Sequence, residues 1–371
     1  MTSSPLWKLV RLNFGRNPVH FGETGIGLEN TTEQAHSDTL FSALVSSYAK
    51  IFGKSAVEAL FERFSDPVPP FRLSSSFIYQ HQETNGQQTC VDYLPKPIIR
   101  PPHYPTEDLA FAKTYRKLAY LPLSVWQRWY QHSGFNQQDV QTLKNYTKDP
   151  ENISSDEPLA AAGTFTYQDA FKKSTLPKVS IDRSTRATNF YHTKFVQYAE
   201  QAGLYFLVNL PAEDTTLLQE LQAALIFLGE EGIGGERSSG AGRFVPSWHD
   251  LPPEWMSLFN TDAATHHSLI SLFWANPDTQ QFSQVEQAIA ADTQKQTYYS
   301  LKPRGGWIAS PAGHQMRRQV VSMMAEGSVL PTSIFPKGPL GELADVTPAK
   351  FKRHRIYRSG VSVSLPVALA L

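Results

Sequence analysis

The run GLYFLVNL at residues 203–210 is almost continuously apolar. A strand that is covered on both faces has this pattern, because successive side chains point to opposite faces and both sets must avoid water. The run therefore predicts the central strand of a sheet. The segments on either side of it then decide which sheet the chain builds.

Five further segments have the periodicity of a strand or a helix: a strand at 7–14, a helix at 36–52, a strand at 71–79, a helix at 216–229 and a strand at 242–248. Ser37 is the expected N-cap of the first helix, and Thr216 with Gln219 forms an expected capping box for the second. With the central strand, the order is strand, helix, strand, strand, helix, strand. This is the split βαβ, or ferredoxin-like, plan.

Two regions extend this plan. Residues 80–200 separate the second and third strands, and their aromatic and helical pieces predict an inserted lobe rather than a linker. From about residue 262 a weaker copy of the pattern begins, ending in the alternating stretch RIYRSGVSVSLPV. We therefore expect an α+β fold with two ferredoxin-like (RRM-like) domains in tandem, residues 1–255 and 256–371, and a large insertion at about 80–200 in the first.

Composition narrows the class of protein. The formal net charge is zero, but residues 96–194 hold fourteen Lys and Arg against nine Asp and Glu, so a basic face is expected there. No stretch approaches the roughly 20 apolar residues that span a membrane. Cys90 is the only cysteine, which excludes a disulfide framework and a cysteine-based zinc site, and a cytoplasmic protein is the simplest interpretation.

The stretch GIGGERSSGAGRF at residues 232–244 follows the second helix. It lacks the lysine of a P-loop, and Arg237 stands where a dinucleotide fingerprint requires its third glycine. Glycines allow left-handed backbone and can turn N–H groups outward, and the loop adds the arginines 237 and 243 and two serines. These features predict a binding loop for an extended polyanion. A flexible surface turn with solvated arginines is the alternative.

Several stretches together resemble the RAMP superfamily of CRISPR effector proteins: VHFGETGIGLEN (19–30), HSDTLFSAL (36–44), SIDRSTRATNFYH (180–192), GIGGERSSGAGRF (232–244) and IYRSGVSVSLP (356–366). Within it they are similar to the Cas5-like group, and specifically to the type III-A (Csm) effector subunit that caps the 5′ end of the guide RNA. The stretches cover nearly the whole chain in the expected order, whereas residues 80–180 carry little of the resemblance.

The resemblance implies a non-catalytic RNA-binding subunit that holds the 5′ tag of the crRNA. Its implied protein partners are the large cyclase (polymerase-like) subunit and the neighbouring RAMP backbone subunit. It would meet target RNA only indirectly, through a thumb-like hairpin in the insertion. Neither a cofactor nor a metal site is expected, and no membrane contact.

The expected RNA-binding residues lie in four stretches of the chain: His20, Phe21 and Gly22; His36 and Ser37; Arg183 and Arg186; and Gly234, Gly235, Arg237, Ser238, Ser239, Gly240, Gly242 and Arg243. Phe21 is expected either to stack on a base or to pack against the next helix. Asp182 is expected to orient Arg183. The basic run at 350–358 fits either an RNA or partner surface, or a strand edge guarded by charge.

Two alternatives to the non-catalytic RNA-binding subunit remain. One is a CRISPR RNA-processing endoribonuclease of the same superfamily, in which His36 acts as general acid or base. The sequence shows no partner for that histidine. The other is a protein scaffold whose basic patches are incidental.

Overall fold

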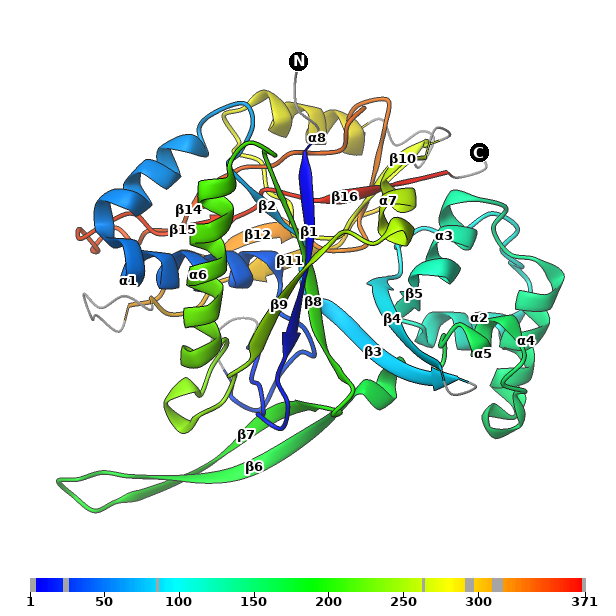
Figure 1. The fold of residues 1–371 in the computed structure, drawn as a ribbon, viewed down its shortest axis with the longest axis horizontal. Coiled ribbons are helices and arrows are strands. Elements are labelled where there is room, and N and C mark those ends of the chain that lie inside the picture. The colour runs from blue at the N-terminus through cyan, green and yellow to red at the C-terminus, as the bar shows by residue number, and fades with distance from the viewer. Residues whose placement is uncertain are drawn as a thin grey trace.

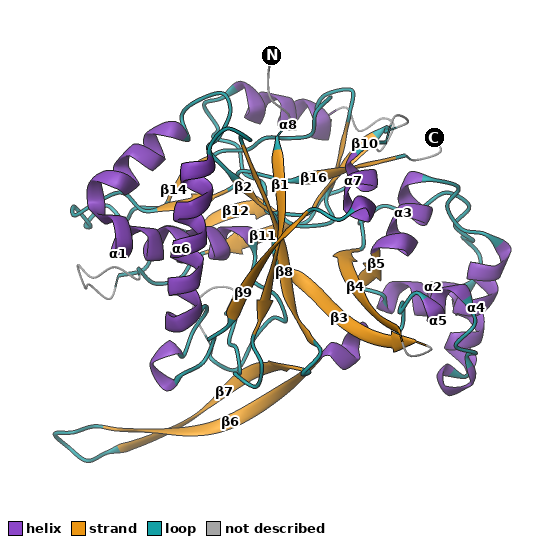
Figure 2. Ribbon diagram, in the orientation of Figure 1, coloured by secondary structure: helices purple, strands orange, loops and turns teal. Residues whose placement is uncertain are grey.

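A computed structural model describes residues 5–22, 27–84, 87–261, 264–290, 297–308 and 316–368. Helices and antiparallel strands are mixed throughout, as the α+β class requires (Figures 1 and 2). The main sheet crosses the middle of the view, a helical lobe lies on one side, and a long hairpin projects below. Within the described residues, no helix combines the length and apolar character that crossing a membrane needs.

The main sheet has the strand order β5-β4-β3-β8-β1-β9. Its members are β1 (Leu6–Asn13), β2 (Arg72–Leu73), β3 (Phe77–Thr84), β4 (Gln87–Pro95), β5 (Tyr120–Pro122), β8 (Ala202–Leu210) and β9 (Val245–Asp250). The predicted central strand is β8, whose nine residues are all buried and which pairs antiparallel with β1, β2 and β3. Strand β1 lies between β8 and β9, so the first and last strands of the ferredoxin-like plan are neighbours.

Helices α1 (Ser37–Arg63) and α6 (Thr215–Glu231) pack against each other beside the main sheet (Figure 1). Both predicted caps are wrong. The N-cap of α1 is His36, without a side-chain hydrogen bond, and the N-cap of α6 is Asp214, whose carboxylate accepts the N–H of Leu217. The capping-box pattern at Thr216 failed because the helix begins one residue before it, after an aspartate whose carboxylate accepts the N–H of Leu217.

The predicted strand at 71–79 is interrupted at three buried serines, 74–76. Their N–H groups donate to Leu207 O, Ile270 O and Ala35 O respectively. The interruption therefore joins the main sheet to α1 and to the C-terminal residues. A serine can accept a neighbouring backbone N–H while its own backbone leaves the ladder, which explains why three stand together here.

The insertion forms a helical lobe and a hairpin. The lobe contains α2 (Leu109–Lys117), α3 (Leu123–Gln131), α4 (Gln137–Lys148), α5 (Pro158–Ala161) and the short helices η1 (Pro150–Asn152) and η2 (Tyr167–Ala170). Its interior is aromatic, with Trp126, Trp129 and Tyr130 fully buried. The hairpin of β6 (Phe171–Ile181) and β7 (Thr188–Tyr198) extends away from the body of the protein (Figure 2).

The C-terminal part consists of α7 (Pro253–Phe259), β10 (His266–Leu269), α8 (Gln280–Ala290), β11 (Leu301–Arg304), β12 (Val321–Met324), β13 (Val329–Pro331), β14 (Leu343–Asp345), β15 (Tyr357–Ser359) and β16 (Ser364–Val367). Strand β10 pairs antiparallel with β13 and β16, and β11 with β12. Between β13 and β16, where the tandem prediction needs a second helix, the chain forms the hairpin β14–β15.

A single hydrophobic cluster runs from the main sheet through the lobe into the C-terminal part, where it includes Ile270, Val329 and Leu365. Two smaller clusters, around Phe273 and around Met323, complete the C-terminal part. The packing is therefore continuous on both sides of residue 255. The boundary between residues 1–255 and 256–371 stays a prediction.

Candidate nucleic-acid interface

A cleft of about 220 Å³ lies where the start of α1, the glycine loop (residues 232–244) and the residues after β11 meet. Of the expected RNA-binding residues, it brings together Phe21, Gly22, His36, Gly234, Gly235 and Arg237. The opposite wall is C-terminal and consists of Arg304, Gly305, Gly306, Trp307, Arg318 and Arg358. Segments far apart in the sequence thus share one concave surface that presents both backbone and cationic side chains.

The glycine loop is held mainly by its own backbone. The N–H groups of Gly232, Gly235, Gly240 and Gly242 donate to Leu228 O, His20 O, Arg237 O and Pro18 O, at 2.7 to 2.9 Å. The expectation that these N–H groups point outward as anion donors is therefore wrong for four of the five glycines. A loop that leaves a helix must satisfy its amides somewhere, and here neighbouring carbonyls lie within reach.

The glycines are nevertheless required by backbone geometry. Gly234 has φ +88°, and a Cβ there would lie 2.4 Å from His20 O. Gly242 has φ +81°, and a Cβ there would lie 2.0 Å from Ile233 O. A side chain at Gly234 would therefore push the loop off the segment after β1, and one at Gly242 would push apart the two sides of the loop itself.

A buried ion cluster forms the floor of the cleft. The Asp38 carboxylate is fully buried in the first turn of α1 and accepts two hydrogen bonds from Arg304, both at 2.9 Å. Arg358, on β15, forms a second ion pair with the same carboxylate. Burial would raise the pKa of Asp38, but the charges of Arg358 and Arg304 outweigh it and hold the pKa below its ordinary value.

Arg318 is the third arginine of this cluster. Its Nε is buried and has no hydrogen-bond partner within the described residues. Burial and the nearby charge of Arg358 lower the pKa of Arg318 to about 10, so the side chain is still charged at neutral pH. Two guanidinium groups are therefore paired with the Asp38 carboxylate, and a third lies close enough to feel its charge.

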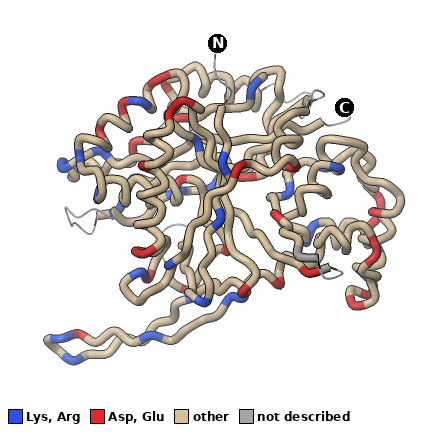
Figure 3. Tube along the Cα trace, in the orientation of Figure 1, with Lys and Arg blue, Asp and Glu red and all other residues tan. Residues whose placement is uncertain are grey.

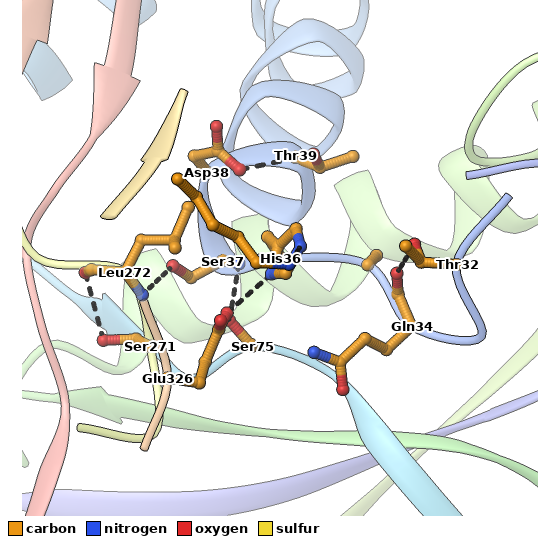
Figure 4. Close-up of polar contacts among 12 residues, drawn as sticks. Thr32, Gln34, His36, Ser37, Asp38, Thr39, Ser75, Ser271, Leu272 and Glu326 are labelled. Carbon is orange, nitrogen blue, oxygen red and sulfur yellow. Dashed lines mark hydrogen bonds and ion pairs between the residues drawn. The ribbon is translucent and has the colours of Figure 1, made fainter. Parts of the chain in front are cut away.

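A second polar network lies beside the first at the start of α1 (Figure 4). The ring atom Nδ1 of His36 is 2.7 Å from Glu326 Oε1, and Ser75 donates a hydrogen bond to the same oxygen. On the other side of the ring, Lys302 Nζ is 3.2 Å from His36 Nε2. Burial would raise the pKa of Glu326, but His36 and the hydrogen bonds from His36 and Ser75 lower it to about 2.

Several expected contact residues are buried. His20, Phe21, His36 and Ser37 are each at most 4% exposed. Ser37 accepts the N–H of Leu272 and its own N–H donates to Ser75 Oγ, so its polar groups hold the fold together (Figure 4). Of the two interpretations of Phe21, packing fits this burial and base stacking does not.

Arg183 and Arg186 lie in the exposed turn between β6 and β7 and do not line the cleft. The hairpin that carries this turn projects from the body of the protein (Figure 3). Asp182 does not orient Arg183 as expected. Its carboxylate accepts the N–H groups of Ser184 and Thr185 and so shapes the turn. These backbone hydrogen bonds lower the pKa of Asp182.

The β6–β7 hairpin and the glycine loop are connected through side-chain contacts of Lys178. Lys178 on β6 forms an ion pair with Glu236 and donates a hydrogen bond to Ser239, both in the loop. Arg237, Ser238, Ser239 and Arg243 are exposed. The exposed part of the loop and the basic hairpin therefore form one continuous surface.

Sequence analysis missed the C-terminal wall of the cleft. The stretch RGGW at residues 304–307 was the available signal, because two glycines beside an arginine and a tryptophan are a poor choice for an ordinary strand. The basic run at 350–358 is divided by the structure. Residues 352–355 are exposed, whereas Arg358 is 5% exposed and belongs to the ion cluster.

Comparison with known proteins agrees with this architecture. Residues 263–367 match the family model described as the CRISPR Csm4 C-terminal domain. A protein of Methanocaldococcus jannaschii, named CRISPR system Cms protein Csm4, is 24% identical over 389 residues, and the match covers 94% of each chain.

Solved structures show the same fold. A chain from a structure described as the Csm3-Csm4 subcomplex in the type III-A CRISPR-Cas interference complex has a TM-score of 0.58 at 20% identity, over 97% of this chain and 99% of the other. A chain from the Csm1-Csm4 cassette in complex with cA4 has a TM-score of 0.56 at 19% identity, over 99% of this chain and 100% of the other.

The fold and these matches define a RAMP subunit of the Cas5-like group, from a type III-A CRISPR system. Within that group, the chain is similar over most of its length to proteins named Csm4, and residues 263–367 match the Csm4 C-terminal domain. The resemblance stated from the sequence motifs is confirmed at this level.

The first prediction concerns acid stability. Glu326 and Asp38 both have a folded pKa below the unfolded value, so their stabilisation is complete above about pH 5 and is lost as pH falls through the folded values. The free energy of unfolding should therefore decrease from pH 5 to pH 2.5 in denaturant titrations. In Glu326→Gln the slope should be shallower by up to one proton, about 1.4 kcal/mol per pH unit. The exposed Glu62→Gln should keep the parent slope, and equal slopes in all three proteins would contradict the assignment.

The second prediction compares two glycines of the loop. Gly240 and Gly242 have φ +84° and +81°, but a Cβ at Gly240 meets nothing within 4 Å. Gly240→Ala should cost about 1 kcal/mol of unfolding free energy from backbone strain alone. Gly242→Ala should cost a further 1 to 3 kcal/mol, roughly, from the collision with Ile233 O. Denaturant titration measures both, and equal losses would show that close packing of the loop is unimportant.

Proposed function

We propose that the chain is a non-catalytic RNA-binding subunit of a type III-A CRISPR interference complex, in which it holds the 5′ tag of the crRNA. The observation that carries this proposal is the cleft, where the glycine loop faces a C-terminal wall with three arginines and Trp307. A single RNA strand needs cations for its phosphates and flat surfaces for its unstacked bases. The C-terminal wall supplies both, and Arg237 adds a cation from the glycine loop.

Different side chains of this cleft are assigned to the bases and to the phosphates of the RNA. Trp307 is 46% exposed, and Arg317 lies over its ring at 4.9 Å, so one face of the indole has a cation beside it. We assign base stacking to Trp307, in place of the buried Phe21. Arg237 and Arg243 are the exposed cations of the glycine loop and are assigned to phosphates along the strand.

The proposed partners are the large cyclase subunit on one side and a RAMP backbone subunit on the other. The structural neighbours support this, because their descriptions pair Csm4 with Csm1 in one case and with Csm3 in the other. By this proposal the chain bridges the two subunits while it holds the end of the guide.

The β6–β7 hairpin is the proposed contact with target RNA. Residues 171–198 contain six Lys and Arg and one Asp, and the apolar side chains of Val179, Ile181 and Phe190 are more than half exposed. Exposed apolar side chains on a basic ribbon suit the edge of a nucleic-acid duplex better than water. The hairpin would then be the thumb that the family resemblance implies.

We also propose that the C-terminal residues are a second, degenerate ferredoxin-like unit. Bridges between Phe273 and Met324 and between Tyr298 and Val329 extend β10 to β12 and β13 to the start of β11. The strands then lie in the order β16, β10, β12 with β13, and β11. This order repeats that of β9, β1, β8 and β3 in the main sheet. The hairpin β14–β15 replaces the second helix of this unit.

A second candidate function is RNA cleavage. The contact between His36 and Glu326 favours it, because a carboxylate beside a histidine is the usual orienting partner of a general base. Against it, His36 is 3% exposed and Lys302 is in contact with its other ring nitrogen. Among the described residues, no group of three His, Cys, Asp or Glu side chains could hold a metal ion.

The third prediction separates these functions. The purified chain, incubated with repeat-derived RNA, should form a complex whose RNA runs at full length on a denaturing gel. The reason is that the buried ring of His36 is out of reach of a substrate. Cleavage products that disappear in a folded His36→Ala variant would instead establish the endoribonuclease.

The fourth prediction concerns Trp307. Stacking of one base contributes roughly 1 to 3 kcal/mol, so Trp307→Ala should weaken binding of tag-bearing single-stranded RNA by roughly 5- to 150-fold. Trp307→Phe should keep most of the affinity, because it retains an aromatic face. Fluorescence anisotropy with labelled RNA measures both. If Trp307→Ala binds like the parent chain while Arg237→Ala and Arg243→Ala weaken binding, the bases lie elsewhere.

A further inference from the structure

Within the part of the chain that the structure describes, the floor of the cleft brings three arginines to one carboxylate. Arg304, Arg318 and Arg358 surround Asp38, which leaves an excess of two positive charges within the described residues. Arginine does not lose its proton at physiological pH, so this excess persists in the free protein. Charges held away from water without a counter-ion are unfavourable, and the folded chain gains stability when an anion arrives.

The geometry of the three arginines fits a ligand-binding site better than an ion pair with only a structural role. Arg304 and Arg358 are fixed by their bonds to Asp38, and Arg304 also donates to Thr39 Oγ1 at 3.0 Å. Arg318 is only half-buried as a residue, and it lines the same cleft as Gly306 and Gly235. Two cations are thus held in place by Asp38, and a third, Arg318, lines the cleft and has a buried Nε without a hydrogen-bond partner within the described residues.

We propose that the Arg304–Arg318–Arg358 cluster is a binding site for one phosphate group, which supplies the counter-charge that Asp38 leaves missing. The oxygens of a phosphate group match the N–H donors of guanidinium groups in number and geometry. In the assembled complex the phosphate belongs to the bound guide RNA, a step that rests on the function proposed above. Because Asp38 is on α1, Arg304 on β11 and Arg358 on β15, an occupied site also ties the first helix to the C-terminal strands.

The first experiment needs no RNA. Thermal unfolding of the full chain is followed in sodium phosphate and in sodium chloride at equal ionic strength. Phosphate should raise the Tm of the parent chain in a concentration-dependent way, by several degrees at saturation, because it binds only the folded state. Arg318→Gln should lose this rise and, in chloride, should melt at the parent temperature or above it, since it relieves the charge excess. Arg318→Lys should keep part of the rise.

The matched control is Arg317→Gln. Arg317 is exposed and adjacent in sequence, but it lies over Trp307 and does not line the cleft. It should keep the full phosphate effect. Equal phosphate effects in Arg318→Gln and Arg317→Gln, or no effect in the parent chain, would overturn the proposal, because the anion would then act on the surface in general.

The second experiment identifies the source of the phosphate. The parent chain and Arg318→Gln are titrated with the same RNA bearing either a 5′-hydroxyl or a 5′-phosphate. A terminal phosphate in the site predicts that the parent chain prefers the 5′-phosphorylated RNA and that the variant loses this preference. An internal phosphodiester predicts no preference and an equal loss of affinity for both RNAs. If Arg318→Gln loses the effect of inorganic phosphate but binds both RNAs like the parent chain, the phosphate site stands and the proposed path of the RNA through the cleft is wrong.

Discussion

The interaction on which the rest of the structure depends is the buried carboxylate of Asp38 with its two arginines. It lies in the first turn of a helix from one half of the chain and receives cations from two strands of the other half. Removing one partner of such a group leaves a buried charge without compensation, so the arrangement is retained as a whole or lost as a whole. The cleft exists because this contact fixes its floor, and the glycine loop closes against it from the opposite side.

The elements whose side chains follow a clear period could be predicted from the sequence. The run at 203–210, the alternation at 7–14 and the stripe of Leu40, Leu44 and Tyr48 each report burial directly, and the structure places them as expected. The helix caps could not be predicted with the same success, because Asp214 and Thr216 both fit the start of α6 and only the three-dimensional course of the chain chooses between them. The hairpin β14–β15 was missed as well, since its strands are only three residues long and pair with each other.

For the site, the sequence identified one wall and not the other. The glycine loop and the start of α1 are recognisable because their composition is unusual. The arginines at 304, 318 and 358 look like any surface arginines until the fold brings them to one aspartate from positions more than 260 residues away. Charge pairing between residues so far apart leaves no periodic pattern in the amino-acid sequence. It also explains why the sequence did not indicate that the Asp38 carboxylate binds guanidinium groups.

The insertion begins and ends at paired positions of the main sheet, and its own strands β4 and β5 extend that sheet at one edge. Gln80 on β3 pairs with Ala202 on β8, so about 120 residues begin and end at one rung of the ladder. Nothing in the pairing of β1, β8 and β9 depends on what lies between those two points. Evolution can therefore lengthen, shorten or exchange the lobe and the hairpin without moving the cleft. The lobe and the hairpin are thus free to differ in length, while the rung at Gln80 and Ala202 keeps the frame around the cleft constant.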